Sequence, residues 1–285
     1  MLKASAKRIF EGFIYSGAFS ALASVSLVFT VSTLLSQKLT WDFVLVIFLA
    51  THGPYLYNRY VELKKDVSTN PRRVGFLKRM VGFIPFILIL YVALLFGIVL
   101  YFQKVDVLVV GLVVLLFAFG YSKFFKSLSR KIVAFKDFYV AFWWAFVLFI
   151  FTIYYKFSIS TVTFVSLFVF FFIRFLVNII FFDIKDVVID REEGILTFPV
   201  VLGVRRTVYM IIFLSLVAVV PLFYAIFSGY LSKSAILLGL TFPYTLVYAS
   251  FALTNARLDE KIYYLIVDGE EVWFWPLLAV AGSFL

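Results

Sequence analysis

The sequence lacks several residue types on which common active sites depend. It has no cysteine and a single histidine, His52. Disulfide bonds and thiolate chemistry are therefore excluded, and so is a metal site built from histidines and carboxylates. Neither a nucleophilic triad nor a glycine-rich phosphate loop is present. Charged residues are also scarce, at 15% of the chain against about 25% in soluble domains.

Hydrophobic residues, in contrast, make up 64% of the chain. Many apolar runs reach the roughly 20 residues that a helix needs to cross a hydrocarbon core of about 30 Å. We therefore expect an all-α, polytopic integral membrane protein. The first apolar run is too long to be the core of a cleaved signal peptide, so we expect it to be the first span. The net charge of +10 is attributed to loop residues that face anionic membrane lipid, and no nucleic-acid partner is expected.

Nine membrane spans are predicted from the apolar runs between charged or turn-forming breaks. They cover residues 11–35, 41–61, 80–102, 105–121, 137–155, 161–182, 207–228, 233–254 and 272–285. The last of these is short for a full crossing. No hydrophilic stretch is long enough for a second domain, so residues 1–285 are expected to form one membrane-embedded domain.

The basic residues predict the orientation of these spans. With the N-terminus in the cytoplasm, 21 of the 26 lysines and arginines fall in cytoplasmic segments and four fall outside, with Arg174 left inside a span. Such a bias follows the positive-inside rule. The segments after the second and sixth spans are therefore predicted to be cytoplasmic.

Two acidic motifs occupy those two segments. The first runs from Asn58 to Asp66 and includes Glu62, and the second contains Asp183, Asp186 and Asp190. Glu62 and Asp66 are four residues apart, as are Asp186 and Asp190, which on a helix places both carboxylates of a pair on one face. The two pairs lie 124 residues apart. This offset suggests a nine-helix bundle made of two four-helix pseudo-repeats plus a final helix.

Paired carboxylates on one side of a membrane favour a magnesium site. Isolated acids at a membrane boundary usually only solvate helix ends or pair with lysines, but two matched pairs reinforced by Asn58 and Asp183 are harder to explain that way. Such hard oxygen ligands suit Mg²⁺, which completes its shell with waters and phosphate oxygens. The expected metal ligands are Asn58, Glu62, Asp66, Asp183, Asp186 and Asp190.

Basic residues beside the motifs predict a phosphorylated ligand. Lysine and arginine can share the charge of a diphosphate that Mg²⁺ only partly neutralises. The candidates for diphosphate binding are Asn58, Arg59, Arg72, Arg73, Lys126 and Asn178, together with Lys123. Arg174 lies one helical turn before Asn178, and an arginine at that depth is expected to face either a polar cavity or a partner within the bundle.

These residues together resemble the UbiA superfamily of intramembrane prenyltransferases. The family's second motif, D-x-x-D-x-x-x-D, is matched in full by Asp183, Asp186 and Asp190, and the continuation Arg191–Gly203 is similar to the family's D-R-x-x-G-x-x-T-x-P-V-x-x-G. Tyr121 and Lys123 resemble its tyrosine–lysine motif. The first motif, commonly N-D-x-x-D-x-x-x-D, differs here because Arg59 and Glu62 replace its first two acids.

The resemblance implies a Mg²⁺-dependent prenyltransferase, with two metal ions holding a prenyl diphosphate between the motifs. A prenyl group such as geranyl, farnesyl or geranylgeranyl would pass to a lipophilic acceptor with release of diphosphate. The residues with implied catalytic roles are Asp66, Tyr121, Lys123 and Asp190. An aromatic or quinone precursor, an ether-lipid glycerol and a carotenoid all stay open as acceptors. No feature of the sequence sets an oligomeric state.

The main alternative is a multi-pass transporter with a cytoplasmic-side acidic site. Transport predicts charged residues near the middle of the membrane, whereas most acids here cluster at its cytoplasmic edge. A CDP-alcohol phosphotransferase is a weaker alternative, because the signature D-x-x-D-G-x-x-A-R is absent.

Overall fold

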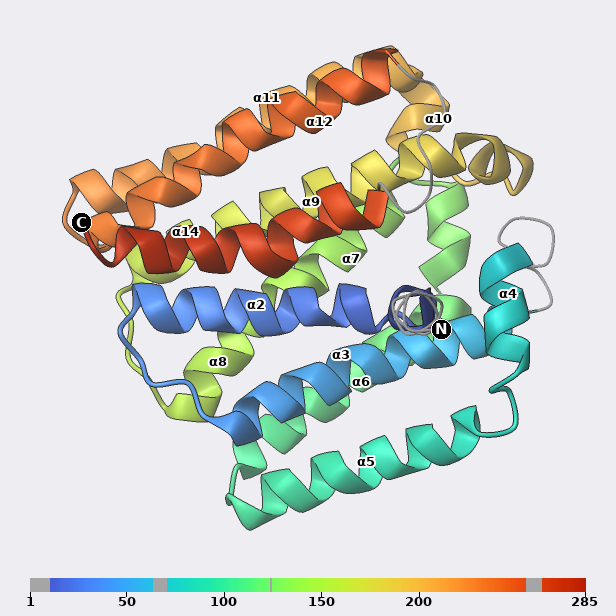
Figure 1. The fold of residues 1–285 in the computed structure, drawn as a ribbon, viewed down its shortest axis with the longest axis horizontal. Coiled ribbons are helices and arrows are strands. Elements are labelled where there is room, and N and C mark those ends of the chain that lie inside the picture. Colours follow the sequence, from blue (N-terminus) through green and yellow to red (C-terminus); the bar gives the residue numbers. More distant parts are fainter. Residues whose placement is uncertain (1–10, 64–70, 124, 255–262) are drawn as a thin grey trace, which may run out of the picture.

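The computed structural model describes residues 11–63, 71–123, 125–254 and 263–285. Within these ranges the chain is helical and contains no strand. Most helices run side by side between two ends of one bundle, and successive long helices alternate in direction (Figure 1). The helices α3 and α9, which carry the two acidic motifs, both end at the same end of the bundle.

The first half of the chain provides α2 to α6. A helical segment over residues 11–16 precedes α2. The helices that follow are α2 (Ala18–Leu34), α3 (Trp41–Glu62), α4 (Pro71–Lys78), α5 (Ile84–Tyr101) and α6 (Val105–Lys123). A 3-10 turn, η1 (Phe125–Arg130), then leads into the second half.

The second half begins with α7 (Phe135–Ala145) and α8 (Val147–Tyr155), which form one nearly continuous helical stretch. It continues through α9 (Thr161–Glu192), α10 (Phe198–Leu202), α11 (Val204–Phe227), the 3-10 segment η2 (Lys233–Leu240) and α12 (Thr241–Thr254). Two π-helical segments, η3 (Tyr263–Asp268) and η4 (Glu270–Phe274), then run into α14 (Trp275–Gly282).

Helix α9 is the central element and the longest, with 32 residues. The Ser160 hydroxyl caps its first turn by accepting a hydrogen bond from the Thr163 amide at 3.0 Å. At 1.5 Å per residue the helix is about 48 Å long, well beyond a hydrocarbon core of about 30 Å. The predicted span ended at residue 182, but the helix continues for another turn and more, so that the second acidic motif lies on its last turns rather than in a loop.

The core surrounds α9, while α5 lies at the edge of the bundle. Four phenylalanines of α9, Phe170, Phe171, Phe175 and Phe181, are at most 2% exposed, and three of them contact the ring of Trp275. In contrast, only 11% of α5 is buried within the protein, and Figure 1 shows it on the outer edge. The high apolar content of the sequence thus divides between a packed interior and a surface suited to lipid.

Five described stretches are long and apolar enough to cross a membrane. They are Ile84–Tyr101, Phe135–Tyr155, Thr161–Glu192, Val204–Phe227 and Lys233–Leu253. The shorter apolar helices are Ala18–Leu34 and Val105–Val114. The protein is therefore an integral membrane protein, while the count of nine spans and the two pseudo-repeats stay predictions. The last predicted span is corrected at its start, because the helical stretch begins by residue 263 rather than 272 and includes three acids.

Candidate functional site

A polar cavity of about 410 Å³ lies among α2, α3, α7, α9 and the π-helical segments. Its charged lining residues are Arg59, Lys136, Asp183, Asp186, Asp268 and Glu271. The remaining wall is largely aromatic or aliphatic and includes Tyr55, Val140, Trp144, Phe175, Ile179, Phe182 and Tyr264, with Ser20 and Asn178 as further polar groups. The cavity therefore combines a charged region with an apolar region.

The second acidic motif is folded around a lysine. Lys136, in the first turn of α7, places its Nζ 2.7 Å from Asp183 Oδ1 and 3.8 Å from Asp190 Oδ2. Both aspartates are buried, with 3% and 6% exposure. From the sequence, Lys136 is only one of the 21 basic residues predicted to be cytoplasmic. Nothing in the sequence shows that α7 packs against α9.

Orphaned oxygens remain in this cluster despite the lysine. Asp183 Oδ2 and Asp190 Oδ2 are buried and have no hydrogen-bond partner, and the same is true of both carboxylate oxygens of Asp137, the residue after Lys136. A buried carboxylate oxygen without a donor is costly unless a cation or a ligand compensates it. Asp186 is more accessible, and its Oδ1 lies 3.5 Å from Lys185 Nζ.

Arg59, which stands in place of an acid in the first motif, is a buried cation on the cavity wall. Its Nη1 donates hydrogen bonds to the backbone carbonyl oxygens of Ile14, at 2.9 Å, and of Tyr15. The chain can present both carbonyls because Gly17 has φ of 88°, and a Cβ there would lie 3.2 Å from the guanidinium carbon. The described part of the first motif therefore adds positive charge to the cavity.

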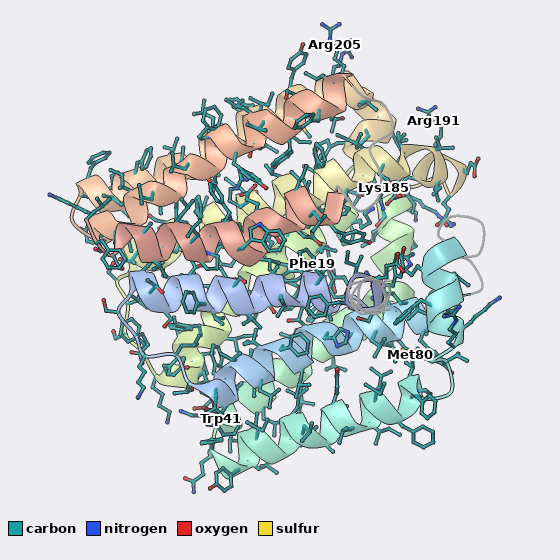
Figure 2. The ribbon with its side chains drawn as sticks, viewed as in Figure 1. Phe19, Trp41, Met80, Lys185, Arg191 and Arg205 are labelled. Carbon is teal, nitrogen blue, oxygen red and sulfur yellow. The ribbon has the colours of Figure 1, made fainter. Side chains whose placement is uncertain are left out.

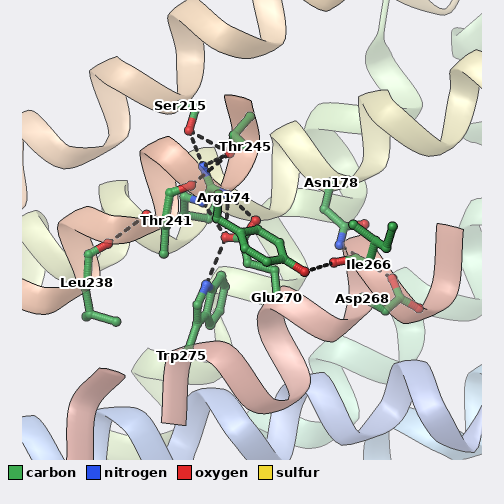
Figure 3. Close-up of polar contacts among 11 residues, drawn as sticks. Arg174, Asn178, Ser215, Leu238, Thr241, Thr245, Ile266, Asp268, Glu270 and Trp275 are labelled. Atoms are coloured by element: carbon green, nitrogen blue, oxygen red, sulfur yellow. Dashed lines mark hydrogen bonds and ion pairs between the residues drawn. The ribbon is translucent and has the colours of Figure 1, made fainter. Parts of the chain in front are cut away.

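Two acids that the sequence analysis missed also line this cavity. Asp268 accepts a hydrogen bond from Ser20 Oγ at 2.9 Å. It accepts another from Asn178 Nδ2 at 3.5 Å (Figure 3). Glu271 is 5% exposed, and its Oε1 has no hydrogen-bond partner. The sequence signal that could have found them is the acidic run Asp268-Gly269-Glu270-Glu271, which lies between apolar segments.

The side chain of Arg174 points to a partner rather than to this cavity. Its Nε donates to Glu270 Oε1 at 2.9 Å, and its other nitrogens contact Glu270, Ser215 and Thr245 (Figure 3). Trp275 Nε1 donates to the same Glu270 oxygen at 3.1 Å. Of the two positions predicted for Arg174, the partner within the bundle is the correct one.

The predicted site residues are only partly brought together. Arg59, Asn178, Asp183 and Asp186 line the cavity, and Asp190 joins it through Lys136. Asn58 is exposed and is not among the lining residues, whereas Arg73 is half-buried on α4. Glu62, Arg72, Tyr121, Lys123 and Lys126 lie in helical segments, but the structure does not describe their side chains, and Asp66 falls outside the described residues.

The donor set fits Mg²⁺ on the side of the second motif. In the described ranges, no three acidic or histidine side chains gather closely enough to hold a metal by themselves. Asp183 and Asp190 nevertheless offer buried oxygens without hydrogen-bond partners, and carboxylate oxygens are what Mg²⁺ prefers. A complete site would need further oxygens, which a bound phosphate, waters or the acids of the first motif can supply.

Side chains in Figure 2 also show how the ends of the bundle differ. Lys185, Arg191 and Arg205 gather at the end where α9 terminates, whereas Trp41 lies at the opposite end. The basic residues at the first end agree with the charge asymmetry of the sequence. The cavity is thus built where positive charge accumulates, which favours anionic ligands.

Comparison with known proteins gives one family and one fold. The sequence profile of the UbiA prenyltransferase family matches residues 17–276. None of the curated proteins matches the chain. Solved structures with the same fold include a UbiA homolog from Archaeoglobus fulgidus bound to GPP and Mg²⁺, with TM-score 0.67 and 12% identity over 96% of this chain and 100% of that one.

Two further structures are similar over nearly their whole length. The apo structure of a UbiA homolog from Aeropyrum pernix K1 has TM-score 0.66 and 14% identity, over 95% of this chain and 98% of that one. A structure described as digeranylgeranylglyceryl phosphate synthase has TM-score 0.61 and 16% identity, over 98% of this chain and 100% of that one. At these identities the likeness concerns the fold.

Proposed function

The chain belongs to the UbiA prenyltransferase family, and from that premise we propose that it transfers a prenyl group from a prenyl diphosphate to a lipophilic acceptor at the polar cavity, with Mg²⁺ and with release of diphosphate. One observation carries this proposal. Buried carboxylate oxygens without hydrogen-bond partners, two cations and an aromatic wall occur together at one cavity. Family membership makes the protein a membrane-embedded prenyltransferase, and the cavity is where its chemistry fits.

The diphosphate end of the donor would bind at the second acidic motif. Asp183, Asp186 and Asp190 would hold Mg²⁺, two ions if the acids of the first motif take part, and the bound metal would supply charge neutralisation to the leaving diphosphate. Lys136 and Arg59 line the same space and can donate hydrogen bonds to phosphate oxygens. These two cations would neutralise part of the negative charge of the diphosphate, a task that otherwise falls to the metal ions alone.

The prenyl end would lie against the apolar wall. Trp144 and Phe175 are stacked with their ring centroids 5.2 Å apart, and Tyr55 lies beside Trp144 at 6.0 Å. When the bond between the allylic carbon and the diphosphate oxygen breaks, the electron pair leaves with the diphosphate and the carbon becomes cationic. Ring faces stabilise such a cation and exclude water that would otherwise capture it.

The cavity's position also supports the proposed topology. Both motif-bearing helices end at the basic end of the bundle (Figures 1 and 2), and the positive-inside rule then assigns that end to the cytoplasm. A water-soluble diphosphate head would enter from there, while the tail would be drawn from lipid. We also propose that residues 1–285 form the single domain that carries out this reaction.

The test is a transfer assay with the full chain reconstituted in lipid nanodiscs. Labelled dimethylallyl, geranyl, farnesyl and geranylgeranyl diphosphates are supplied with Mg²⁺ and with an aromatic, a glycerol-ether or a carotenoid acceptor. Asp186→Ala and Asp190→Ala should abolish diphosphate release, whereas Asp106→Asn, an exposed acid at the opposite end of the bundle, should not. Unchanged release in both motif variants would contradict the proposal.

A further inference from the structure

The cavity contains a second acidic pair, Asp268 and Glu271, that lies deeper in the bundle than the second motif. Asp268 is hydrogen-bonded to Asn178, which precedes Asp183 by five residues and Asp186 by eight along α9. These separations correspond to about 7.5 and 12 Å along the helix axis. The pair is therefore displaced from the diphosphate end of the cavity toward its apolar wall.

Glu271 has no partner for one of its carboxylate oxygens. Its Oε1 is buried without a hydrogen bond, although Glu271 is only 5% exposed and lines the cavity. Arg174, whose charge also acts on Glu271, is committed to Glu270, Ser215 and Thr245. Leaving a carboxylate oxygen unsatisfied inside a membrane protein is costly, and such groups are retained where a ligand or a reaction uses them.

Asp268 is, in contrast, held in a fixed position. Ser20 from α2 and Asn178 from α9 donate to its two different oxygens. Both acids come from π-helical turns, which are frequently found at functional sites. Tyr55, Arg59 and Tyr264 are the other titratable groups on this part of the wall, with Lys136, Asp183 and Asp186 toward the motif. One carboxylate held at both oxygens and one with a single unpartnered oxygen thus face the space where the allylic carbon would lie.

We propose that Asp268 and Glu271 form the acceptor subsite and that it selects a lipophilic acceptor carrying a hydroxyl group. Asp268 accepts a hydrogen bond that orients the acceptor, and Glu271 takes the hydroxyl proton. This inference rests on the proposed function. The allylic C–O bond breaks with its electron pair leaving on diphosphate, the acceptor's hydroxyl oxygen bonds to the allylic carbon, and the hydroxyl proton passes to the Glu271 carboxylate. When an activated ring carbon forms the bond instead, the proton on that carbon is the one finally lost and the hydroxyl group re-forms.

The experiment compares donor binding with transfer in the full chain in nanodiscs. The donor is labelled geranylgeranyl diphosphate, and the acceptors are geranylgeranylglyceryl phosphate, 4-hydroxybenzoate and lycopene, which has no hydroxyl. Hydrolysis of the donor to geranylgeraniol, with water as the hydroxylic acceptor, is followed in parallel. Donor affinity is measured separately with geranylgeranyl thiodiphosphate and Mg²⁺.

Glu271→Gln is expected to lower kcat for transfer and hydrolysis about 100-fold, as for loss of a general base, with thiodiphosphate affinity within about twofold of wild type. Glu271→Asp should recover part of the rate, and Asp268→Asn should mainly raise the KM for the acceptor. Lycopene should not be prenylated. Glu270→Gln is the matched control, because Glu270 lies outside the cavity lining; its rate per folded molecule should equal that of wild type.

The outcomes separate the two proposals. If wild type releases diphosphate and Glu271→Gln does so at an equal rate, the acceptor subsite is contradicted while the proposed function stands. A Glu271→Gln variant that loses donor affinity as severely as Asp183→Asn also contradicts it, since Glu271 would then serve the diphosphate. Wild type that neither transfers nor hydrolyses the donor contradicts the proposed function itself.

Discussion

Glu270 and Glu271 are adjacent in sequence and equally buried, yet their surroundings differ completely. Glu270 receives hydrogen bonds from Arg174 and Trp275, and Arg174 is in turn held to Ser215 and Thr245. Glu271 faces the cavity with one oxygen unpartnered. Glu270 joins η4 to α9, α11 and α12, whereas Glu271 keeps one oxygen, Oε1, without a hydrogen-bond partner. Burial alone therefore does not distinguish these two carboxylates, whereas their hydrogen-bond partners do.

The same contrast holds for α9 as a whole. In its buried middle, Arg174 has its charge matched by a carboxylate and its remaining donors matched by hydroxyls. Near its end, Lys136 meets the aspartates of the second motif and leaves two buried oxygens without partners. The Arg174 network is complete, whereas the Lys136 network has too little positive charge for its carboxylates. This difference agrees with a site at Lys136 that binds a cation together with an anionic substrate.

The largest effect is expected from breaking the complete network. Arg174→Met would leave the Glu270 carboxylate buried with only Trp275 as a donor, and should lower the free energy of unfolding by about 3–5 kcal/mol. Equilibrium unfolding in mixed micelles measures this loss. The double variant Arg174→Met, Glu270→Gln should recover most of it. A single variant as stable as wild type would show that the network contributes nothing to stability.

The next effect concerns the deficient network. Asp183→Asn removes one buried acid and the 2.7 Å ion pair with Lys136, and should lower turnover about 10²–10³-fold, as for loss of one strong electrostatic contact to a transition state. Its unfolding midpoint should stay close to that of wild type. Rapid-quench measurement of diphosphate release checks the rate, and a variant that is inactive only because it has unfolded would weaken the contrast.

A smaller change is expected at the lysine. Lys136→Met removes a cation that can contact phosphate, and should weaken donor affinity about tenfold, the size of one charge-assisted hydrogen bond. Mg²⁺ binding without donor should become tighter, because the metal no longer competes with the ammonium group for Asp183. Calorimetry with Mg²⁺ alone and with geranylgeranyl thiodiphosphate separates the two effects. Weaker binding of both ligands would contradict the competition.

The smallest effect is predicted for Trp275→Phe. The ring still fills the space among Phe170, Phe171 and Phe175, but the Nε1 donor to Glu270 is lost. The expected destabilisation is about 1 kcal/mol, measured by the same unfolding experiment, with transfer activity per folded molecule unchanged. A loss as large as that of Arg174→Met would mean that packing, rather than the hydrogen bond, is the main contribution of this residue.

The elements that depend on local pattern were predictable from the sequence. Long apolar runs gave the helices, and the four-residue spacing of Asp186 and Asp190 indicated a shared helical face, in agreement with their place on α9. The depth of Arg174 predicted either a polar cavity or a partner within the bundle, and only the structure shows that it is the partner, Glu270. The UbiA relationship implied by the motifs is confirmed by the family match over residues 17–276.

The elements that depend on tertiary packing were not predictable. Lys136 lies 47 residues from Asp183 and Glu270 lies 96 residues from Arg174, so no spacing rule connects them. Arg59 reads as a substituted ligand in the sequence, but its anchoring depends on carbonyls exposed beside Gly17. Asp268 and Glu271 were passed over because the last helical stretch starts earlier than its apolar run. Charged residues inside that helix interrupt the pattern by which spans are recognised.

The proposed function requires this cavity to break the bond between a prenyl group and diphosphate. The most direct measurement is the release of diphosphate from doubly labelled geranylgeranyl diphosphate by wild-type protein in proteoliposomes, with Mg²⁺ and then with EDTA. We expect Mg²⁺-dependent release, with the prenyl label recovered in an acceptor product or in geranylgeraniol. Recovery of the donor intact with Mg²⁺ present, on either side of the membrane, would contradict it.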